Sequence, residues 1–506
     1  MSILEIIVFL PLIAALAIGL GAPARFTALG AAALTLVLSL ILAIQFDGAL
    51  EGDKFQFASS RTLLDIEGFP TLSLAFGLDG ISLVLLLLST LVMVVAVLVS
   101  PQENAIQGGS AKLYYLSLLL IGGGAIGAFT STDLFFLYAF HELALIPTFL
   151  MIGIFGHGEN RVRTAWTITI YLGVGSLILL VGLIMAVFAL GGSTFDVPTL
   201  ITYAKDPATA IAAGSQTWIF VFLLIGFGIL VSLFPFHSWA APAYAEAPAP
   251  VAMLHAGVLK KFGLYGLIRF AMPVVPEGMA ALLNVVLILL LGNIIYIGLV
   301  TVAQKRLDRM LGYSSVMHMG YVFLGLATMN QIGISGAVLL MFAHGVSIAL
   351  LFALCGWIRE KYGTVHFEEL GGIASHLPKL GLLFAFAAFA SAGLPGFANF
   401  AAEVAVFFGA FNGIKGTGES LGWLQWTTII ALWGVVISAV YMLRAFRNLF
   451  LGTPEEKMVR PSDMTLAGRL PYFLLLATLI AVGFVPELLN QFIRPAVEGL
   501  FLVSAG

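Results

Sequence analysis

The sequence predicts an all-α integral membrane protein, because its composition is strongly apolar and its apolar residues fall into long runs. Hydrophobic residues make up 60% of the 506 residues and charged residues only 10%, against roughly 25% charged residues in soluble proteins. A transmembrane helix needs about 20 mostly apolar residues, and by this rule we expect about fourteen spans, at residues 3–21, 27–46, 79–100, 112–130, 133–154, 165–190, 217–238, 248–271, 278–303, 308–329, 332–356, 380–412, 425–450 and 470–493.

The composition also excludes several function classes. A net charge of −3 leaves no basic surface of the size that nucleic acid requires. The single cysteine, Cys355, rules out an internal disulfide, a four-cysteine zinc site and a self-contained iron–sulfur cluster. We therefore expect a protein surrounded by lipid, with no metal and no cofactor on this chain, and with any redox chemistry on other chains.

The predicted spans form four segments along the chain. Residues 1–111 form an N-terminal three-helix segment, whose first helix is expected to be retained because Glu5 lies near its start and a second span follows at once. Two five-helix units follow, at 112–271 and 278–450, and residues 451–506 form a connecting loop and a C-terminal helix. Because five is odd, we expect the two units, spans four to eight and nine to thirteen, to be inverted repeats.

Two of these spans are expected to be broken. Pro235 lies near the end of span seven, and Gly393, Pro395 and Gly396 interrupt span twelve. Breaks in corresponding positions of two repeats are typical of a transport site. Most of the loop lysines and arginines fall on one side of the predicted membrane, which places both termini outside by the positive-inside rule.

Ionisable residues deep in spans are the main candidates for function, because each costs about 2.5–3.5 kcal/mol on insertion scales. Glu142 lies near the middle of span five and is either a protonatable site or a structural carboxylate. Lys260 and Lys261 are adjacent in span eight, and adjacent helical residues point about 100° apart. At least one of them should therefore point into the bundle, whereas Lys260 has the alternative of snorkelling towards the membrane surface.

Histidines and further carboxylates complete the candidates. His318 and His344 lie in successive spans, with His255 and His237 in earlier ones, and a hydrated file of titratable groups competes with simple packing as their interpretation. No histidine spacing typical of a metal site is present. Glu403 follows the break in span twelve. Asp79 and Asp133 start spans three and five, where a helix-capping role is sufficient.

Several motifs carry a family resemblance over nearly the whole chain, and they lie at Gly77–Ser82, His141–Pro147, Pro235–Trp239, Gly312–Gly320, Ala343–Gly345 and Gly393–Glu403. With these motifs the chain resembles the antiporter-like membrane subunits of respiratory complex I, specifically the M subunits of NADH:quinone oxidoreductase. That superfamily also includes subunits of Mrp-type cation/proton antiporters. Glu403 resembles the M type, since the L and N relatives generally carry lysine at this position.

The resemblance implies a proton relay through Glu142, Lys261, His318, His344 and Glu403, with Lys260, His255, His237, Asp79 and Asp133 as supporting residues. One departure from the family pattern affects Glu142. The family has a lysine five residues before Pro235 that pairs with this glutamate, and here the residue is Leu230. Either His237, His255 or Lys260 replaces that partner, or the coupling is changed.

The resemblance therefore implies a proton-translocating subunit of an enzyme complex that oxidises NADH and reduces quinone. Flavin mononucleotide, iron–sulfur clusters and quinone are expected on partner subunits, L-like and N-like chains as neighbours, and the bacterial cytoplasmic membrane as the location. Two alternatives remain open. One is a subunit of a multi-subunit sodium/proton antiporter or a membrane-bound hydrogenase. The other is a non-pumping structural module, which the Leu230 substitution favours.

Overall fold

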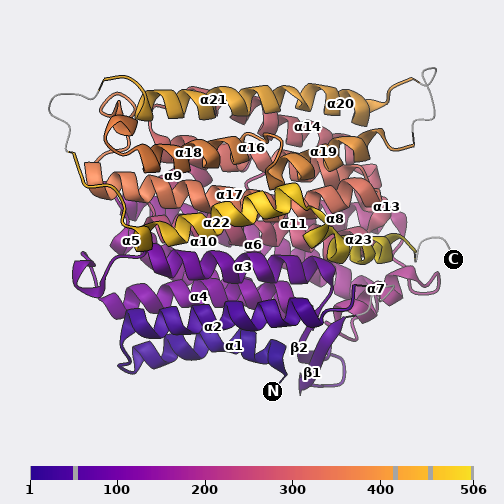
Figure 1. Ribbon diagram of the computed structural model, residues 1–506. Helices are drawn as coiled ribbons and strands as arrows, with labels where there is room; N and C mark the ends of the chain where they lie inside the picture. Colours follow the sequence, from indigo (N-terminus) through magenta and orange to yellow (C-terminus); the bar gives the residue numbers. More distant parts are fainter. Residues whose placement is uncertain (1, 49–54, 414–419, 454–459, 503–506) are drawn as a thin grey trace.

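The computed structural model describes residues 2–48, 55–413, 420–453 and 460–502. Long helices lie side by side with their axes roughly aligned, and a short β-hairpin lies at one end of the bundle (Figure 1). Ten helices in these ranges are long and apolar enough to cross a membrane, or eleven if one bent pair counts as a single span. The prediction of a helical membrane protein is confirmed, while the count of about fourteen spans and the inverted repeats remain predictions.

The N-terminal segment contains the hairpin, which the sequence analysis did not predict. Its strands are antiparallel and lie within a connection expected to be a loop. The elements of this segment are α1 (Ile3–Gly19), α2 (Ala24–Gln45), β1 (Gln56–Leu64), β2 (Leu72–Leu78), α3 (Gly80–Val99) and the 3₁₀ turn Glu103–Ala105. The part of this connection at 49–54 lies outside the described residues. We call the end of the bundle that carries β1 and β2 the hairpin face.

The first predicted five-helix unit contains the first observed break. Helix α8 ends at Val231, and the chain resumes helical structure only at Ala240. The elements are α4 (Ala111–Thr130), α5 (Leu134–Phe155), α6 (Arg161–Ala189), α7 (Val197–Lys205), α8 (Ala213–Val231), α9 (Ala240–Glu246), α10 (Ala249–Leu254), the π-helical segment His255–Leu259, α11 (Lys261–Gly266), the π-helical segment Leu267–Ala271, and α12 (Met272–Val274).

The side chain of Asn293 stabilises this first break. Its Oδ1 accepts a hydrogen bond from the Phe234 backbone N–H at 2.6 Å, and its Nδ2 donates to the carbonyl oxygens of Ser232 and Val316 at 3.3 and 2.8 Å. Backbone groups freed at membrane depth need such partners, because lipid offers none. The backbone groups at the break that Asn293 contacts are therefore hydrogen-bonded. The break itself is expected, because Pro235 interrupts the helix.

The second unit contains the second break, between α18 and α19. Gly393 and Gly396 have φ of 71° and 94° there, a backbone region that favours glycine. The elements are α13 (Pro276–Ala281), α14 (Leu283–Leu291), the π-helical segment Gly292–Ile297, α15 (Gly298–Val302), α16 (Leu307–Ala327), α17 (Gln331–Tyr362), the 3₁₀ turn Ile373–Ser375, α18 (Pro378–Ser391), α19 (Ala398–Phe411), α20 (Trp423–Ala431) and α21 (Trp433–Phe450).

The last two helices, α22 (Leu466–Phe484) and α23 (Glu487–Leu502), meet at a bend of 67°. Helix α23 packs on α3 and α17. Both ends of the described chain lie towards the hairpin face (Figure 1). This agrees with the expectation that the termini share one side, although which side is outside remains a prediction. Part of the predicted 451–469 loop, residues 454–459, lies outside the described residues.

Two helical segments form the centre of the bundle. The most apolar windows of α17 and of the stretch from Ala249 to Val274 are both 100% buried by the rest of the chain. These segments contain His344 and the two lysines 260 and 261. The fold therefore buries several of the predicted titratable residues within the protein itself.

Candidate functional site

Both central lysines are buried, so the alternative of a snorkelling Lys260 is wrong. Lys260 and Lys261 are 1% and 0% exposed. The Nζ of Lys260 donates a hydrogen bond to Ser315 Oγ at 3.3 Å and lies 5.1 Å above the ring of Tyr244. The two side chains therefore have different partners, as their 100° separation predicts.

Lys261 is held by its own helix. Its Nζ donates to the carbonyl oxygen of Ala256 at 2.6 Å, within the π-helical segment His255–Leu259. π-helical segments are rare, alter the hydrogen-bond pattern of the helix and often occur at functional sites. Lys261, which the resemblance places in the relay, is thus engaged locally, whereas the supporting Lys260 reaches a neighbouring helix.

The serine that binds Lys260 also contacts a histidine. Ser315 Oγ is 3.2 Å from His344 Nε2, so one hydroxyl links the lysine on the 249–274 stretch to the imidazole on α17. His344 and His318 stack with ring centroids 5.1 Å apart and planes 20° apart. Polar groups from three helices therefore form one continuous buried cluster.

Both ring nitrogens of His318 face backbone carbonyl oxygens. Nδ1 is 2.8 Å from Ser314 O, and Nε2 is 3.0 Å from Ser391 O. A carbonyl oxygen only accepts, so both contacts are hydrogen bonds only when both nitrogens carry a proton. Ser391 is the last residue of α18, so His318 reaches the second helix break directly.

Glu403 lies at the same break and is 4% exposed. A Cβ atom on Gly393 would be 2.6 Å from Glu403 Oε2, so the carboxylate lies directly against this glycine. Asn399, one turn before Glu403 on α19, donates to Ser347 Oγ at 3.4 Å, and Ser347 is one turn from His344 on α17. The break, the carboxylate and the histidine pair are thus neighbours in the fold.

Glu142 is separate from this cluster. Its side chain is 34% exposed at the surface of the bundle, where the Ser176 hydroxyl donates to it and His141 Nδ1 lies 3.4 Å away. In the described chain none of its contacts is to Lys260, His237 or His255. Of the two alternatives for the missing lysine, direct replacement by one of these residues has no contact to support it among the described residues, and the choice between them remains a prediction.

The supporting histidines differ in position. His255 is buried, with Nδ1 3.4 Å from the Tyr244 hydroxyl, and so lies beside Lys260. His237 is half-buried in the first break, where its ring stacks on Phe234 with centroids 5.6 Å apart. Only the first of these two histidines joins the central cluster.

The two aspartates cap helices, as the sequence analysis expected. Asp79 accepts from the Ser82 backbone N–H at 2.7 Å, and it also pairs with the Arg269 guanidinium at 3.1 Å. Arg269 is 2% exposed inside the 249–274 stretch, and this ion pair offsets part of the cost of burying its charge.

Asp133 is the other cap. Its Oδ1 accepts from the backbone N–H groups of Phe135 and Phe136, and its Oδ2 from that of Ser73 on β2. Burial raises the pKa of Asp133 to about 6, and these hydrogen bonds only partly oppose that shift. The carboxylate thus fastens the hairpin to the start of α5.

Sequence reasoning missed a charged cluster at the end of the bundle opposite the hairpin face. Asp308 is buried and accepts from the guanidinium groups of Arg306 and Arg359. Glu246, at the end of α9, is buried nearby. The only available signal was a carboxylate beside arginines at span ends, which also describes ordinary surface charges. We call this end the arginine-rich face.

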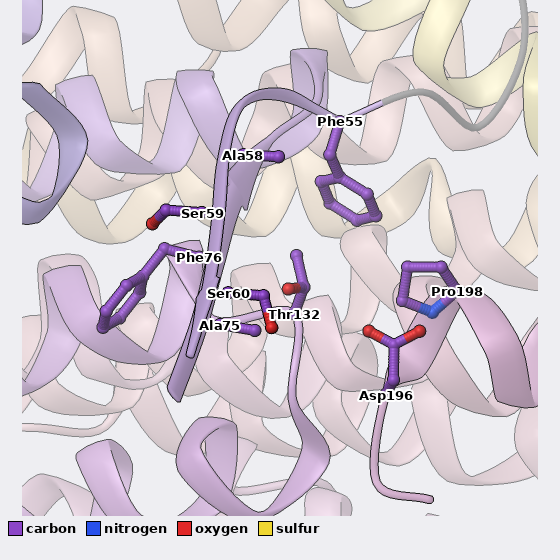
Figure 2. Close-up of a pocket in the computed structure, with 9 residues that line it drawn as sticks. All are labelled: Phe55, Ala58, Ser59, Ser60, Ala75, Phe76, Thr132, Asp196 and Pro198. Carbon is purple, nitrogen blue, oxygen red and sulfur yellow. The ribbon is translucent and has the colours of Figure 1, made fainter. Parts of the chain in front are cut away.

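One pocket opens at the hairpin face, away from the lysine cluster (Figure 2). It has a volume of about 470 Å³. Its polar groups are few, and the Asp196 carboxylate is engaged in capping α7 through the backbone N–H and hydroxyl of Thr199. Among the described residues no group of three or more His, Cys, Asp or Glu side chains could hold a metal ion.

Comparison with known proteins agrees with this architecture. The family described as NADH:quinone oxidoreductase/Mrp antiporter, TM, matches residues 131–444. NADH-quinone oxidoreductase subunit M of Rhodobacter capsulatus is 32% identical over 99% of this chain and 96% of its own length. NAD(P)H-quinone oxidoreductase chain 4 of Gloeobacter violaceus is also 32% identical, over 99% and 93%.

Solved structures give the same result. A chain of respiratory complex I from Thermus thermophilus has a TM-score of 0.86 and 28% identity, and the match covers 99% of this chain and 100% of that one. A chain of the Mrp complex from Dietzia shares the fold, with a TM-score of 0.82 and 21% identity over 100% and 99%. The resemblance seen in the motifs is thereby confirmed, and the chain belongs to the NADH:quinone oxidoreductase/Mrp antiporter family of membrane subunits.

Proposed function

We propose that this chain is a proton-translocating membrane subunit of an NADH:quinone oxidoreductase in a bacterial cytoplasmic membrane. The relatives described above are named as a subunit of an NADH-quinone oxidoreductase and a chain of an NAD(P)H-quinone oxidoreductase. Flavin, iron–sulfur clusters and quinone would be held by other subunits, and L-like and N-like chains would flank this one. The partial exposure of Glu142 favours the presence of a neighbouring chain at that surface, because lipid is a poor environment for a carboxylate.

The observation on which the proposal depends is the hydrogen-bonded connection from Lys260 through Ser315 to His344. A proton released by the lysine reaches the imidazole through the hydroxyl. From there the His344–His318 stack leads to the second break and Glu403. Protons would move from the arginine-rich face, which we take as the inner side, towards the hairpin face.

The energies involved are adequate for such a relay. Moving one charge against 100 mV costs about 2.3 kcal/mol. A change of two units in the pKa of one group is worth about 2.7 kcal/mol. Redox chemistry elsewhere in the complex therefore needs to alter the pairing of only a few buried groups, and Lys260, Lys261 and Glu403 are the ionisable residues placed to respond.

The test is proton pumping per electron in membrane vesicles that contain the assembled complex. We expect Lys260→Met and Glu403→Gln each to lower pumping per NADH oxidised, and Lys305→Met to leave it unchanged, because Lys305 is 73% exposed and pairs only with Glu368 among the described residues. Full pumping in both buried-site variants would leave the non-pumping structural module as the better explanation. Sodium-dependent transport without NADH would favour the antiporter alternative instead.

A further inference from the structure

Helix α16 contacts both broken spans. It packs on α9, with which the helix resumes after the first break, and on α19, which follows the second. A Cβ atom on Gly312 of α16 would lie 2.7 Å from the Cα of Ala241, so the backbones of α16 and α9 are in direct contact. Helix α16 also contains Ser315 and His318 of the buried cluster. A shift of this one helix would therefore reach both breaks and the cluster between them.

Asn293 connects the first break to α16. Its Oδ1 accepts from the Phe234 N–H within the break, and its Nδ2 donates both to the Ser232 carbonyl oxygen and to the Val316 carbonyl oxygen of α16. An asparagine amide offers two N–H donors and one acceptor oxygen, and here all of them have backbone partners. Because one planar group bonds to both elements, the break cannot move away from α16 without loss of a hydrogen bond.

Close packing fixes Asn293 in this position. The residue is 0% exposed and lies in a π-helical segment, a rare form of helix that often marks functional sites. A Cβ on Gly292 would lie 2.6 Å from the ring of Phe234 in the break, and one on Gly320 of α16 would lie 2.9 Å from the Leu290 carbonyl oxygen. Larger residues at either glycine would therefore push the segment away from the break or from α16.

His318 connects α16 to the second break. Its Nε2 lies 3.0 Å from the carbonyl oxygen of Ser391, with which α18 ends before the break. Val316, which Asn293 contacts, is only two residues before His318, so the two connections are attached to α16 about 3 Å apart along its axis. A helix is stiff over so short a distance, and a displacement at one connection is therefore felt at the other.

We propose that Asn293 and His318 couple the two broken spans through α16, so that a local opening at one break loosens the other. Loss of the Asn293 bonds frees α16 at Val316, and a helix that can shift there no longer holds its contact with Ser391. Rigid helices and hydrogen-bond networks carry coupling of this kind. Asn293 is therefore a positioning residue that acts through α16. The inference goes beyond the proposed function, because it concerns movement of the breaks and not the path of a proton.

The experiment measures amide hydrogen exchange in the assembled complex without NADH, by mass spectrometry of peptides that cover residues 228–239 and 389–399. Asn293→Ala removes the connection to the first break. His318→Phe removes both ring nitrogens and keeps a ring in the stack with its neighbour. We expect each variant to speed exchange at both breaks by about 2- to 10-fold, the factor that corresponds to one lost hydrogen bond.

Asn330→Ala is the matched control. The Asn330 amide makes the same set of bonds as Asn293: its Oδ1 accepts from a backbone N–H at 3.0 Å, and its Nδ2 donates to two carbonyl oxygens at 3.2 and 2.7 Å. These bonds lie at the start of α17 and near the end of α19, away from both breaks. Exchange at 228–239 and at 389–399 should therefore be unchanged in this variant.

Faster exchange at the first break alone in Asn293→Ala would overturn the coupling and make Asn293 a local stabiliser. Equal changes in Asn330→Ala would also overturn it, because loss of any such asparagine would then loosen the whole bundle. If Asn293→Ala does not assemble, His318→Phe decides, and unchanged exchange at 228–239 would refute the coupling. Coupled exchange together with full pumping in Lys260→Met and Glu403→Gln would keep the coupling and overturn the proposed function instead.

Discussion

His318 and His344 stack face to face, with ring centroids 5.1 Å apart, at the centre of the membrane-embedded bundle. Two unit charges about 5 Å apart repel by roughly 3 kcal/mol at an effective dielectric constant of about 20. The pair therefore holds one proton more readily than two. Both nitrogens of His318 face carbonyl oxygens, so His318 is the member of the pair on which a second N–H would find an acceptor.

The first prediction concerns this stack. Replacing His318 or His344 by glutamine should lower pumping per electron to a common level, and the double variant should be no worse, because both residues serve one path. His376→Gln is the control, since that histidine lies outside the cluster and bonds to Tyr362. Vesicle acidification measured against NADH oxidation is the assay. Losses that multiply in the double variant would show that the histidines act independently.

The second prediction concerns the hydroxyl between Lys260 and His344. Ser315→Ala removes the only hydroxyl that contacts both groups among the described residues, so pumping should fall while NADH oxidation and assembly persist. A single hydrogen bond contributes only about 0.5–1.5 kcal/mol to stability. Ser315→Thr should restore pumping. Ser314→Ala is the matched control, because the Ser314 hydroxyl contacts Tyr441 instead. Equal losses in the two alanine variants would contradict the role of Ser315.

The third prediction separates backbone strain from displacement of Glu403. Gly393→Ala and Gly396→Ala both introduce a side chain at positive φ, at a cost of about 1–3 kcal/mol each. Only at Gly393 would the new Cβ meet the Glu403 carboxylate, at 2.6 Å, whereas at Gly396 the nearest atom is 3.5 Å away on Phe484. Both variants should assemble less well, and only Gly393→Ala should lose pumping per assembled complex. Similar pumping in both would mean that the contact with Glu403 is unimportant.

The fourth prediction concerns pH and Asp133. Its pKa of about 6 in the folded chain is above its ordinary value of 3.8, so the folded state binds more protons than the unfolded state between these values. Its contribution to the free energy of unfolding is therefore greatest at low pH and is lost as the pH rises through about 6. The loss is on the order of 3 kcal/mol. The thermal stability of Asp133→Asn, relative to the unmodified protein, should rise across this interval. A constant difference from pH 4 to pH 7 would contradict the assignment.

Much of the site was visible in the sequence because local chemistry determines it. The breaks at Pro235 and at Gly393 follow from the missing N–H of proline and the backbone freedom of glycine. The helix caps at Asp79 and Asp133 follow from carboxylates that precede apolar runs. These features depend on residues close together in the chain, so no knowledge of the packing was needed.

Other features depend on which helices pack together. Glu142 and Lys260 are both ionisable residues within apolar runs, yet one is partly exposed at the surface and the other is fully enclosed. Arg269 is buried because Asp79, far away in the sequence, meets it. Glu246 meets Gly158 because the fold brings the loop between α5 and α6 against the end of α9.

By itself, the sequence determined that this is a helical membrane protein with two broken spans and a small set of ionisable residues at membrane depth, because hydropathy and backbone chemistry act over short distances. Only the tertiary structure decided which of those residues meet. The side chain of Lys260 reaches Ser315 and that of Lys261 turns back to Ala256. The physical reason is that a hydrogen bond depends on ångström-scale positions, and the packing of separate helices determines those positions.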